Sequence, residues 1–344
     1  MQLTIDLTGR EVLVTGADHA ARQAVRRYEA AGAVVYRLST PHGASLDGPL
    51  PERPFLVAAV EDGQPGWEAL LDRCRAIGIP VAAEPAAGPA GHVTLVGGGP
   101  GTTELLTVAA VAALRDADVV FYDRLAPYQE LPSLTSAELV DVGKKPGHHK
   151  VSQADIEKLM VESALAGNNV VRLKGGDPYV FGRGGEEVAS CVAAGVPVRV
   201  VSGVTSAISV PAAAGIPVTH REVSHMFTVV SGHAPLTENE LTHLAGLGGT
   251  IVVLMGIGTL HHLAAGLRRA GMRADMPMAV VERGYRPGQR TTIAELGTIT
   301  SAAAGCSNPA VLVIGEVVRV AEANRGSAEA TAELDRLAAS LMEA

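Results

Sequence analysis

The stretch VVRLKGGDPYVFGRGGEE, residues 170–187, decides the fold of the chain around it. It opens as an apolar, β-branched strand and ends in the first residues of a helix that starts at Gly184. Between the two stand an aspartate and the basic residues Lys174 and Arg183. A structural turn needs only one or two glycines, whereas this stretch has five. We therefore expect a loop shaped around a ligand at the carboxyl end of a strand, where open α/β sheets bind ligands.

The alternation of strand, glycine loop and helix continues on both sides of this stretch. It predicts a parallel sheet with helices on its faces over residues 91–216, the first lobe. After Pro217 strand-like runs crowd together, with one clear helix at 260–270, so a second lobe with a more mixed sheet is expected over residues 217–322. Residues 323–344 read as a helical tail. The first-lobe predictions are strands at 169–173 and 197–201 and helices at 153–166, 184–194 and 205–213.

Residues 1–88 form a separate βαβ pattern, divided from the rest by the uncharged PAAGPAG linker at 85–91. Its first strand is followed by TGADHA, which places Thr15, Ala17 and Ala20 at the positions of a GxGxxA dinucleotide fingerprint. Two required glycines are absent, and no acidic residue ends the second strand to hold a ribose. The pattern favours a degenerate Rossmann-like domain without NAD; the alternative is residual NAD binding.

Composition excludes several classes of protein. The 344-residue chain carries a net charge of −8, which argues against general nucleic-acid binding. Its longest apolar stretch, 193–218, is interrupted by prolines, glycines and an arginine, so no membrane span is expected, and no signal peptide is evident. Three scattered cysteines show no metal-binding spacing, which indicates reduced thiols in a cytoplasmic protein without a metal site.

Two glycine loops carry the ligand prediction. GGGPG at 97–101 follows a predicted strand and is expected to open a helix, as a phosphate loop does. However, it lacks the Lys-Ser/Thr of a P-loop, and Pro100 has no N–H to donate, so the loop is better suited to pressing a rigid apolar surface on a ligand. KGGDP at 174–178 lets the backbone approach a ligand closely, and Asp177 offers a carboxylate. An adenosine-containing cationic cofactor would suit such a site. The alternative is a tight turn in which the aspartate caps a helix.

Basic residues recur beside these loops despite the acidic total. GKKPGHHK at 143–150 gathers three lysines and two histidines, and further arginines and histidines stand at predicted strand ends. Solvated surface charge is the ordinary explanation of such a run. Their position favours a polyanionic substrate whose carboxylates are held by guanidinium and ammonium groups.

The motifs, in their order, resemble the tetrapyrrole methylases, and among them the members that methylate uroporphyrinogen III. The matching segments include LVGGGPGTTELLT, ADVVFYDRL, VGKKPGHHKVSQ, GNNVVRLKGGDPYVFGRGGEE, AAGIPVTHR, MPMAVVERG and NPAVLVIG, and they span about residues 91–320. The resemblance implies a two-lobed α/β fold with the active site in the cleft between the lobes, and a homodimer. It implies S-adenosyl-L-methionine as cofactor, released as S-adenosyl-L-homocysteine. The implied reaction methylates C2 and C7 of uroporphyrinogen III to give precorrin-2, for siroheme and cobalamin.

The resemblance also assigns residues. It implies Asp123 as proton acceptor and Lys144 as proton donor. The one departure in the cofactor motifs is SGVT, with Ser202 where the family often has proline, which removes no ligand group. The implied cofactor contacts are Pro100, Gly175, Gly176, Asp177, Val180, Thr205, Ser206, Met255, Gly284 and Ala310. The substrate's carboxylates are expected to meet Arg124, Lys145, His148, Arg172, Arg183, His220, Arg221 and His233.

Residues 7–85 resemble the Rossmann part of siroheme synthases, in which the methylase is fused to a precorrin-2 dehydrogenase and ferrochelatase. Glu84 stands where that module has its proposed catalytic aspartate, and the chelatase-bearing segment is missing before the methylase begins. We expect both of those activities to be lost. The alternatives are a bifunctional enzyme that also oxidises precorrin-2 with NAD, a non-catalytic tetrapyrrole-binding protein, and a methylase of a later corrin intermediate.

Overall fold

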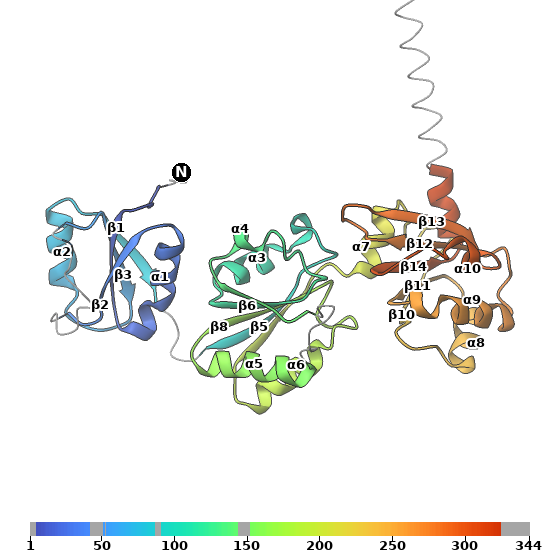
Figure 1. The fold of residues 1–344 in the computed structure, drawn as a ribbon, viewed down its shortest axis with the longest axis horizontal. Coiled ribbons are helices and arrows are strands. Elements are labelled where there is room, and N and C mark those ends of the chain that lie inside the picture. The colour runs from blue at the N-terminus through green and yellow to red at the C-terminus, as the bar shows by residue number, and fades with distance from the viewer. Residues whose placement is uncertain (1–4, 42–50, 52, 87–90, 144–151, 325–344) are drawn as a thin grey trace, which may run out of the picture.

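The structure is a computed structural model that describes residues 5–41, 51, 53–86, 91–143 and 152–324. Three α/β units follow one another along the chain in Figure 1, each built on its own sheet. The predicted helical tail lies almost entirely outside the described residues. No helix in the described ranges is both long and apolar enough to cross a membrane.

The N-terminal unit has a four-stranded parallel sheet in the order β2-β1-β3-β4. Helix α1 packs on one face through Ala24 and Val25, and α2 packs on the other through Cys74, beside Trp67. This strand order is that of a flavodoxin-like doubly wound sheet, with α1 connecting β1 to β2 and α2 connecting β3 to β4. The elements are β1 Glu11–Thr15, α1 Asp18–Ala30, β2 Val34–Leu38, β3 Leu56–Glu61, α2 Glu68–Ala76 and β4 Val81–Pro85.

The first lobe has a five-stranded, all-parallel sheet in the order β7-β6-β8-β5-β9. Helices α3 and α4 cover one face, and α5 and α6 cover the other (Figure 1). The central strands β5 and β8 are therefore buried on both faces, as in other parallel sheets. The elements are β5 His92–Gly97, α3 Val108–Arg115, β6 Val119–Tyr122, α4 Leu131–Leu134, β7 Glu138–Asp141, α5 Gln153–Leu165, β8 Asn169–Lys174, α6 Gly184–Ala193 and β9 Val198–Val201.

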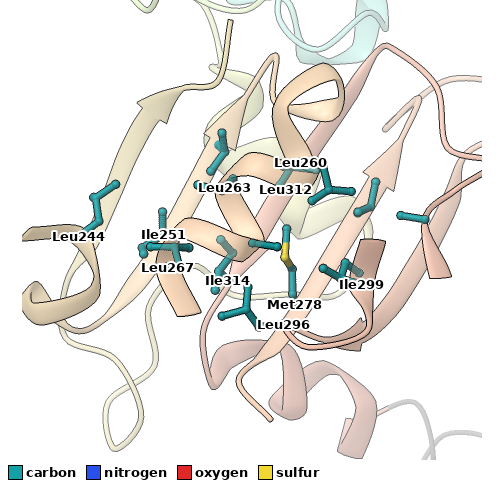
Figure 2. Packing of buried hydrophobic residues seen from close by; sticks show 14 of the residues in the cluster. Leu244, Ile251, Leu260, Leu263, Leu267, Met278, Leu296, Ile299, Leu312 and Ile314 are labelled. Atoms are coloured by element: carbon teal, nitrogen blue, oxygen red, sulfur yellow. The ribbon is translucent and has the colours of Figure 1, made fainter. Parts of the chain in front are cut away.

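The second lobe has a sheet of parallel and antiparallel strands in the order β10-β11-β14-β12-β13. This confirms the prediction of a more mixed sheet after Pro217. Figure 2 shows the core on one face, where apolar side chains of α8, α9 and α10 meet the sheet. Helix α7, which was expected from the sequence among the first-lobe elements, packs on the opposite face of this second-lobe sheet through Ala207 and Val210. The elements are α7 Ser206–Ala213, β10 Phe227–Ser231, α8 Glu238–Leu247, β11 Thr250–Leu254, α9 Leu260–Arg269, β12 Pro277–Glu282, β13 Arg290–Glu295, α10 Ile299–Ala302 and β14 Ala310–Ile314.

Two local predictions were wrong. The second lobe holds more than the one predicted helix, because α8 also forms there, with a capping box between Thr237 and Glu240 that the sequence analysis missed. The GGGPG loop does not open a helix directly. A 3-10 turn intervenes, and α3 begins only at Val108, where the Thr107 hydroxyl caps it by accepting the Ala110 N–H.

The N-terminal unit touches the first lobe through α1. Arg26 Nη1 lies 3.2 Å from an oxygen of Asp118, which is 1 % exposed, and the other oxygen of that carboxylate accepts the Asn169 N–H at 2.8 Å. The contact lies at the end of the first-lobe sheet where β6 and β8 begin, opposite the ligand loops.

Candidate active site

A cavity of about 620 Å³ lies between the two lobes. Its volume is in the range typical of sites for small organic ligands. The first lobe supplies the carboxyl ends of β5, β6 and β8, and the second lobe supplies residues around the ends of β11, β12 and β14. The lining residues include Gly99, Pro100, Asp123, Leu125, Gln153, Arg172, Lys174, Gly175, Gly176, Val180, Phe181, Arg183, Ser206, Met255, Gly284, Arg286 and Ala310.

The two glycine loops pair with each other at the rim of this cavity. Gly176 N donates to Gly99 O at 2.6 Å, and Gly99 N donates to Gly176 O at 3.2 Å. Both residues have positive φ, and a Cβ on the neighbouring Gly175 would overlap Leu125. The glycines are thus required for the close approach of three backbone segments, which leaves exposed peptide surface toward the cavity.

Asp177 fixes this loop from within. One of its oxygens accepts the Tyr179 N–H at 2.8 Å, and the other accepts the Gly203 N–H at 3.0 Å. Thr205 also acts locally, since its hydroxyl caps α7 by accepting the Ala207 N–H. Neither residue is among those that line the cavity, although the sequence analysis expected both to contact a cofactor.

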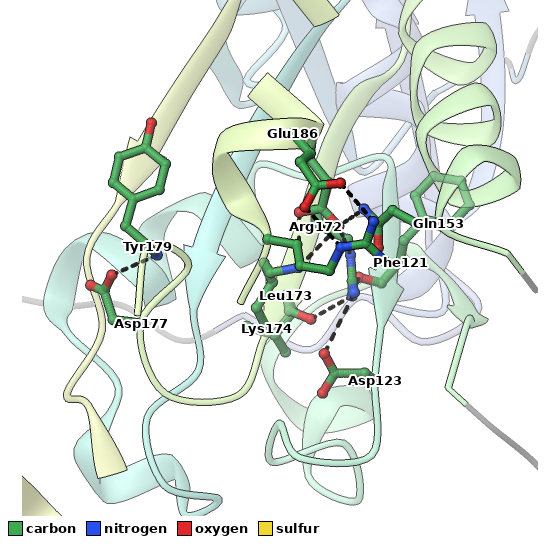
Figure 3. A network of polar contacts seen from close by, with 11 residues as sticks. Phe121, Asp123, Gln153, Arg172, Leu173, Lys174, Asp177, Tyr179 and Glu186 are labelled. Atoms are coloured by element: carbon green, nitrogen blue, oxygen red, sulfur yellow. Dashed lines mark hydrogen bonds and ion pairs between the residues drawn. The ribbon is translucent and has the colours of Figure 1, made fainter. Parts of the chain in front are cut away.

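A buried charge network lies beneath the first-lobe side of the cavity (Figure 3). The Glu187 carboxylate, with no exposed surface, lies 3.1 Å from Arg172 Nε and 2.9 Å from Lys174 Nζ, and it accepts a 3.3 Å hydrogen bond from Gln153. Burial, with the nearby Arg172 charge, lowers the pKa of Lys174 below its ordinary value, against the opposing pull of Glu187. The network holds two cations at the cavity in fixed positions.

Asp123 connects this network to the cavity surface. Its Oδ2 lies 3.5 Å from Arg172 Nη2, and its Oδ1 accepts the Leu125 N–H at 3.0 Å. Its side chain is 26 % exposed, so the carboxylate is oriented by two partners and still reaches the open space of the cavity. A carboxylate so held can accept a proton or stabilise a developing positive charge.

The second-lobe wall has its own anchor at Glu282, on β12. Its side chain is 4 % exposed and lies 2.6 Å from Arg290 Nε, while the Ser307 N–H donates to its other oxygen at 2.8 Å. Burial alone would raise the pKa of the Glu282 carboxyl, but hydrogen bonds from Arg290 and Ser307 outweigh it and lower the pKa from 4.5 to about 2. This carboxylate fixes the segment that leads into Asn308 and Ala310 at the cavity wall.

The Glu282 pair predicts an acid-sensitive contribution to stability. Because the folded-state pKa lies below the unfolded value of 4.5, the stabilisation is complete above that value and is lost as the pH falls toward about 2. Urea unfolding across this pH range should show a steeper loss of unfolding free energy for the wild type than for Glu282→Gln. Parallel pH profiles for the two proteins would contradict the assignment.

Most of the residues expected at the site come together at this cavity, and the rest fall into three groups. Asp177 and Thr205 make the loop contacts described above and do not line it. Arg124, His220 and Arg221 are exposed residues that do not line it. Lys144, Lys145 and His148 lie outside the described residues. Those that line the cavity are Asp123, Pro100, Gly175, Gly176, Val180, Ser206, Met255, Gly284, Ala310, Arg172, Arg183 and His233.

Several residues that line the cavity were not among those predicted from the sequence. Lys174 stands in the KGGDP motif, and Arg283 and Arg286 follow a predicted strand in ERGYRPGQR. The rule that basic residues at strand ends face the ligand would have found all three. Gln153 and Phe181 carry no such signal. No cluster of histidine, cysteine and acidic side chains able to hold a metal ion occurs within the described part of the chain.

Two α/β lobes with a glycine-lined cavity at the carboxyl ends of their strands define a class of proteins that bind a small organic ligand between lobes. Within that class, the profile of the tetrapyrrole (corrin/porphyrin) methylases matches residues 92–300, and the chain belongs to this family.

The similar proteins agree with this placement. The chain is 48 % identical over 237 residues to an S-adenosyl-L-methionine-dependent uroporphyrinogen III methyltransferase of Methanosarcina barkeri, with 67 % of this chain and 93 % of that protein covered. It is 44 % identical to a siroheme synthase of Gluconobacter oxydans, of which it spans 50 %, again with 67 % of this chain covered. A uroporphyrin-III C-methyl transferase of Thermus thermophilus, solved with S-adenyl homocysteine, is 43 % identical with a TM-score of 0.58, over 67 % of this chain and all of that one.

Proposed function

We propose that the chain is an S-adenosyl-L-methionine-dependent uroporphyrinogen-III C-methyltransferase, which methylates C2 and C7 to give precorrin-2 and acts as a cytoplasmic homodimer. The observation that carries the proposal is the interlobe cavity, in which Asp123 and several cations face a glycine loop and an apolar wall. The likeness to methyltransferases of the same substrate, which extends over nearly the whole of those proteins, supports it.

The residues of the cavity fit the cofactor. Gly175 and Gly176 present backbone where a side chain would block the approach, and Pro100, Met255 and Ala310 offer apolar surface. When bound, S-adenosyl-L-methionine supplies an electrophilic methyl group on a sulfonium. The glycine loop and the apolar wall would hold it and exclude water from it, which orients the two reactants.

The charged residues suit the tetrapyrrole. Arg172, Arg183 and His233 line the cavity and would hold carboxylates of the substrate. Asp123 would accept the proton that the ring must lose after it gains a methyl group, or stabilise the positive charge that precedes that loss. Arg172 keeps the carboxylate pointing toward the cavity in the meantime.

The proposal is tested by anaerobic incubation of the protein with uroporphyrinogen III and S-adenosyl-L-methionine, followed by the mass of the product. A gain of two methyl groups is expected. An unchanged mass, with S-adenosyl-L-methionine still bound by the protein, would exclude uroporphyrinogen III as the substrate.

The N-terminal unit is proposed to have no NAD-dependent activity. At the start of α1, where a dinucleotide's pyrophosphate would need free backbone N–H groups, the Ala17 N–H donates to the Asp62 carboxylate at 2.7 Å. Asp18 adds a second carboxylate in the same turn and pairs with the Ser39 hydroxyl. The site is already filled by negative charge, which repels a phosphate.

We therefore expect a calorimetric titration with NAD to show no saturable binding. Thermal unfolding in the presence of NAD should show no rise in melting temperature. S-Adenosyl-L-homocysteine in the same preparation serves as the positive control. Saturable NAD binding, abolished by a bulky residue at Gly16, would support the bifunctional alternative instead.

A further inference from the structure

We propose that Arg286 is an interlobe clamp that positions Asp123 for catalysis. Arg286 follows β12 in the second lobe, and its three guanidinium nitrogens all donate to main-chain carbonyls of the first lobe. Nη2 lies 2.5 Å from Leu125 O, Nη1 lies 3.2 Å from Arg124 O, and Nε lies 3.4 Å from Pro100 O. Hydrogen bonds from a charged donor are stronger than those from a neutral one, so the set is a substantial link between the lobes.

The backbone conformation of the segment around Arg286 directs this side chain toward the first lobe. Arg283 and Tyr285 both have left-handed backbone, with φ of 50° and 60°, a conformation that non-glycine residues adopt only when their surroundings impose it. Gln289 ties this segment to α7, because its side-chain oxygen accepts the Tyr285 N–H at 3.0 Å and its side-chain nitrogen donates to Ala213 O at 2.9 Å. The Arg283 N–H donates to Pro309 O at 2.9 Å.

The first lobe makes room for the guanidinium. A Cβ on Gly101 would overlap the Arg286 side chain, and Gly101 itself has a φ of 118°. The loop thus has a glycine at the one point where the arginine crosses it. The loop that contains Gly101 and the segment that contains Arg286 are therefore complementary in shape, although they lie far apart in the sequence.

The clamp holds the residues directly after Asp123. Arg286 binds the carbonyls of Arg124 and Leu125, and the Leu125 N–H in turn donates to Asp123 Oδ1 at 3.0 Å. The side chains of Arg124 and Leu125 are exposed, although the Leu125 backbone lies against Gly175. Fixing this short turn from the opposite lobe therefore fixes the carboxylate, while Arg172 fixes its other oxygen. Arg286 acts through Asp123 and is a positioning residue.

This inference rests on the proposed methyltransferase function. One of its tests, hydrogen exchange, does not depend on that function. Hydrogen exchange at the backbone of residues 122–127 is expected to speed up at least tenfold in Arg286→Ala relative to the wild type, whatever the substrate. Arg269→Ala removes an exposed arginine that pairs with Glu238 on the surface of the second lobe, and it should leave this exchange unchanged. Unchanged exchange in Arg286→Ala would overturn the clamp.

The catalytic part is tested by a double-mutant cycle. Arg286→Ala is expected to lower kcat about 10- to 100-fold with the affinity for S-adenosyl-L-homocysteine unchanged, because a misaligned catalytic group costs rate and leaves cofactor binding intact. In an Asp123→Asn background the same change should lower kcat less than about twofold, since residues that act as a unit are not additive. Arg286→Lys should recover only part of the loss, because the donors of an ammonium share one nitrogen and cannot span the three carbonyls as the planar guanidinium does.

An equal loss in both backgrounds would mean that Arg286 is only a structural staple, and a loss confined to the KM for uroporphyrinogen III would mean that it binds substrate; either overturns the positioning role. Absence of any methylation by the wild-type protein would refute the proposed function, and the exchange experiment would still decide on the clamp.

Discussion

Replacing Asp123 with asparagine is expected to lower kcat by roughly 10²- to 10⁴-fold, the range typical of a lost general base. The amide keeps an oxygen that can accept the Leu125 N–H and has nearly the same shape, so the local geometry is retained. It can neither take up a proton nor balance a positive charge on the substrate. The affinity for S-adenosyl-L-homocysteine should stay within about twofold of the wild type, because the proposed cofactor surface is formed by other residues.

Two measurements separate this result from a folding defect. Melting temperature and cofactor affinity of Asp123→Asn should match those of Asp275→Asn, which removes an exposed carboxylate near Arg273 away from the cavity. Asp275→Asn should also keep full activity. Full activity in Asp123→Asn would remove this residue from the mechanism, and loss of cofactor binding in parallel with rate would make it a cofactor ligand.

Replacing Glu187 with glutamine is expected to destabilise the protein by about 3–5 kcal/mol, the cost typical of removing one partner from a buried ion pair. Glu187 has no exposed surface and lies against both Arg172 and Lys174. Without its charge the two cations remain buried beside each other, and the nearest remaining carboxylate is Asp123, at 3.5 Å from Arg172. Urea unfolding at neutral pH measures the change.

The adjacent residue supplies the matched control. Glu186 pairs with Arg183 at 2.6 Å, but both side chains are 54 % exposed, so Glu186→Gln should cost less than about 1 kcal/mol. The contrast between neighbouring glutamates isolates the effect of burial. Equal effects for the two variants would show that the network under the cavity contributes little to folding.

The residues around KGGDP and YDRL show what local sequence could predict. Strand β8, helix α6 and the glycine loop between them follow from periodicity and from glycines that no ordinary turn requires. Asp123 was identified through the resemblance of YDRL to the family motif. The basic residues at the strand ends were located because parallel strands bring their carboxyl ends to one edge of the sheet. The proposed cofactor surface around Gly175 and Gly176 depends on the same rule.

Contacts between segments that are distant in the sequence could not be predicted from it. The Arg286 clamp joins residues of opposite lobes, and neither ERGYRPGQR nor GGGPG carries a local sign of the other. Glu187 reads as one of two glutamates at the start of a helix, and only the packing of α5 and α6 on the sheet shows that one is buried and the other exposed. Asp177 reads as a free carboxylate, yet its oxygens accept backbone N–H groups of its own loop and of Gly203.

In the proposed reaction, the protein transfers two methyl groups from S-adenosyl-L-methionine to uroporphyrinogen III. The most direct measurement is carbon NMR of the product formed anaerobically from uroporphyrinogen III and S-adenosyl-L-methionine labelled with ¹³C in its methyl group. We predict two labelled methyl groups, attached to C2 and C7, and no label in product from Asp123→Asn over the same time. Label at other ring carbons, or an unlabelled tetrapyrrole with the cofactor still bound, would contradict the account.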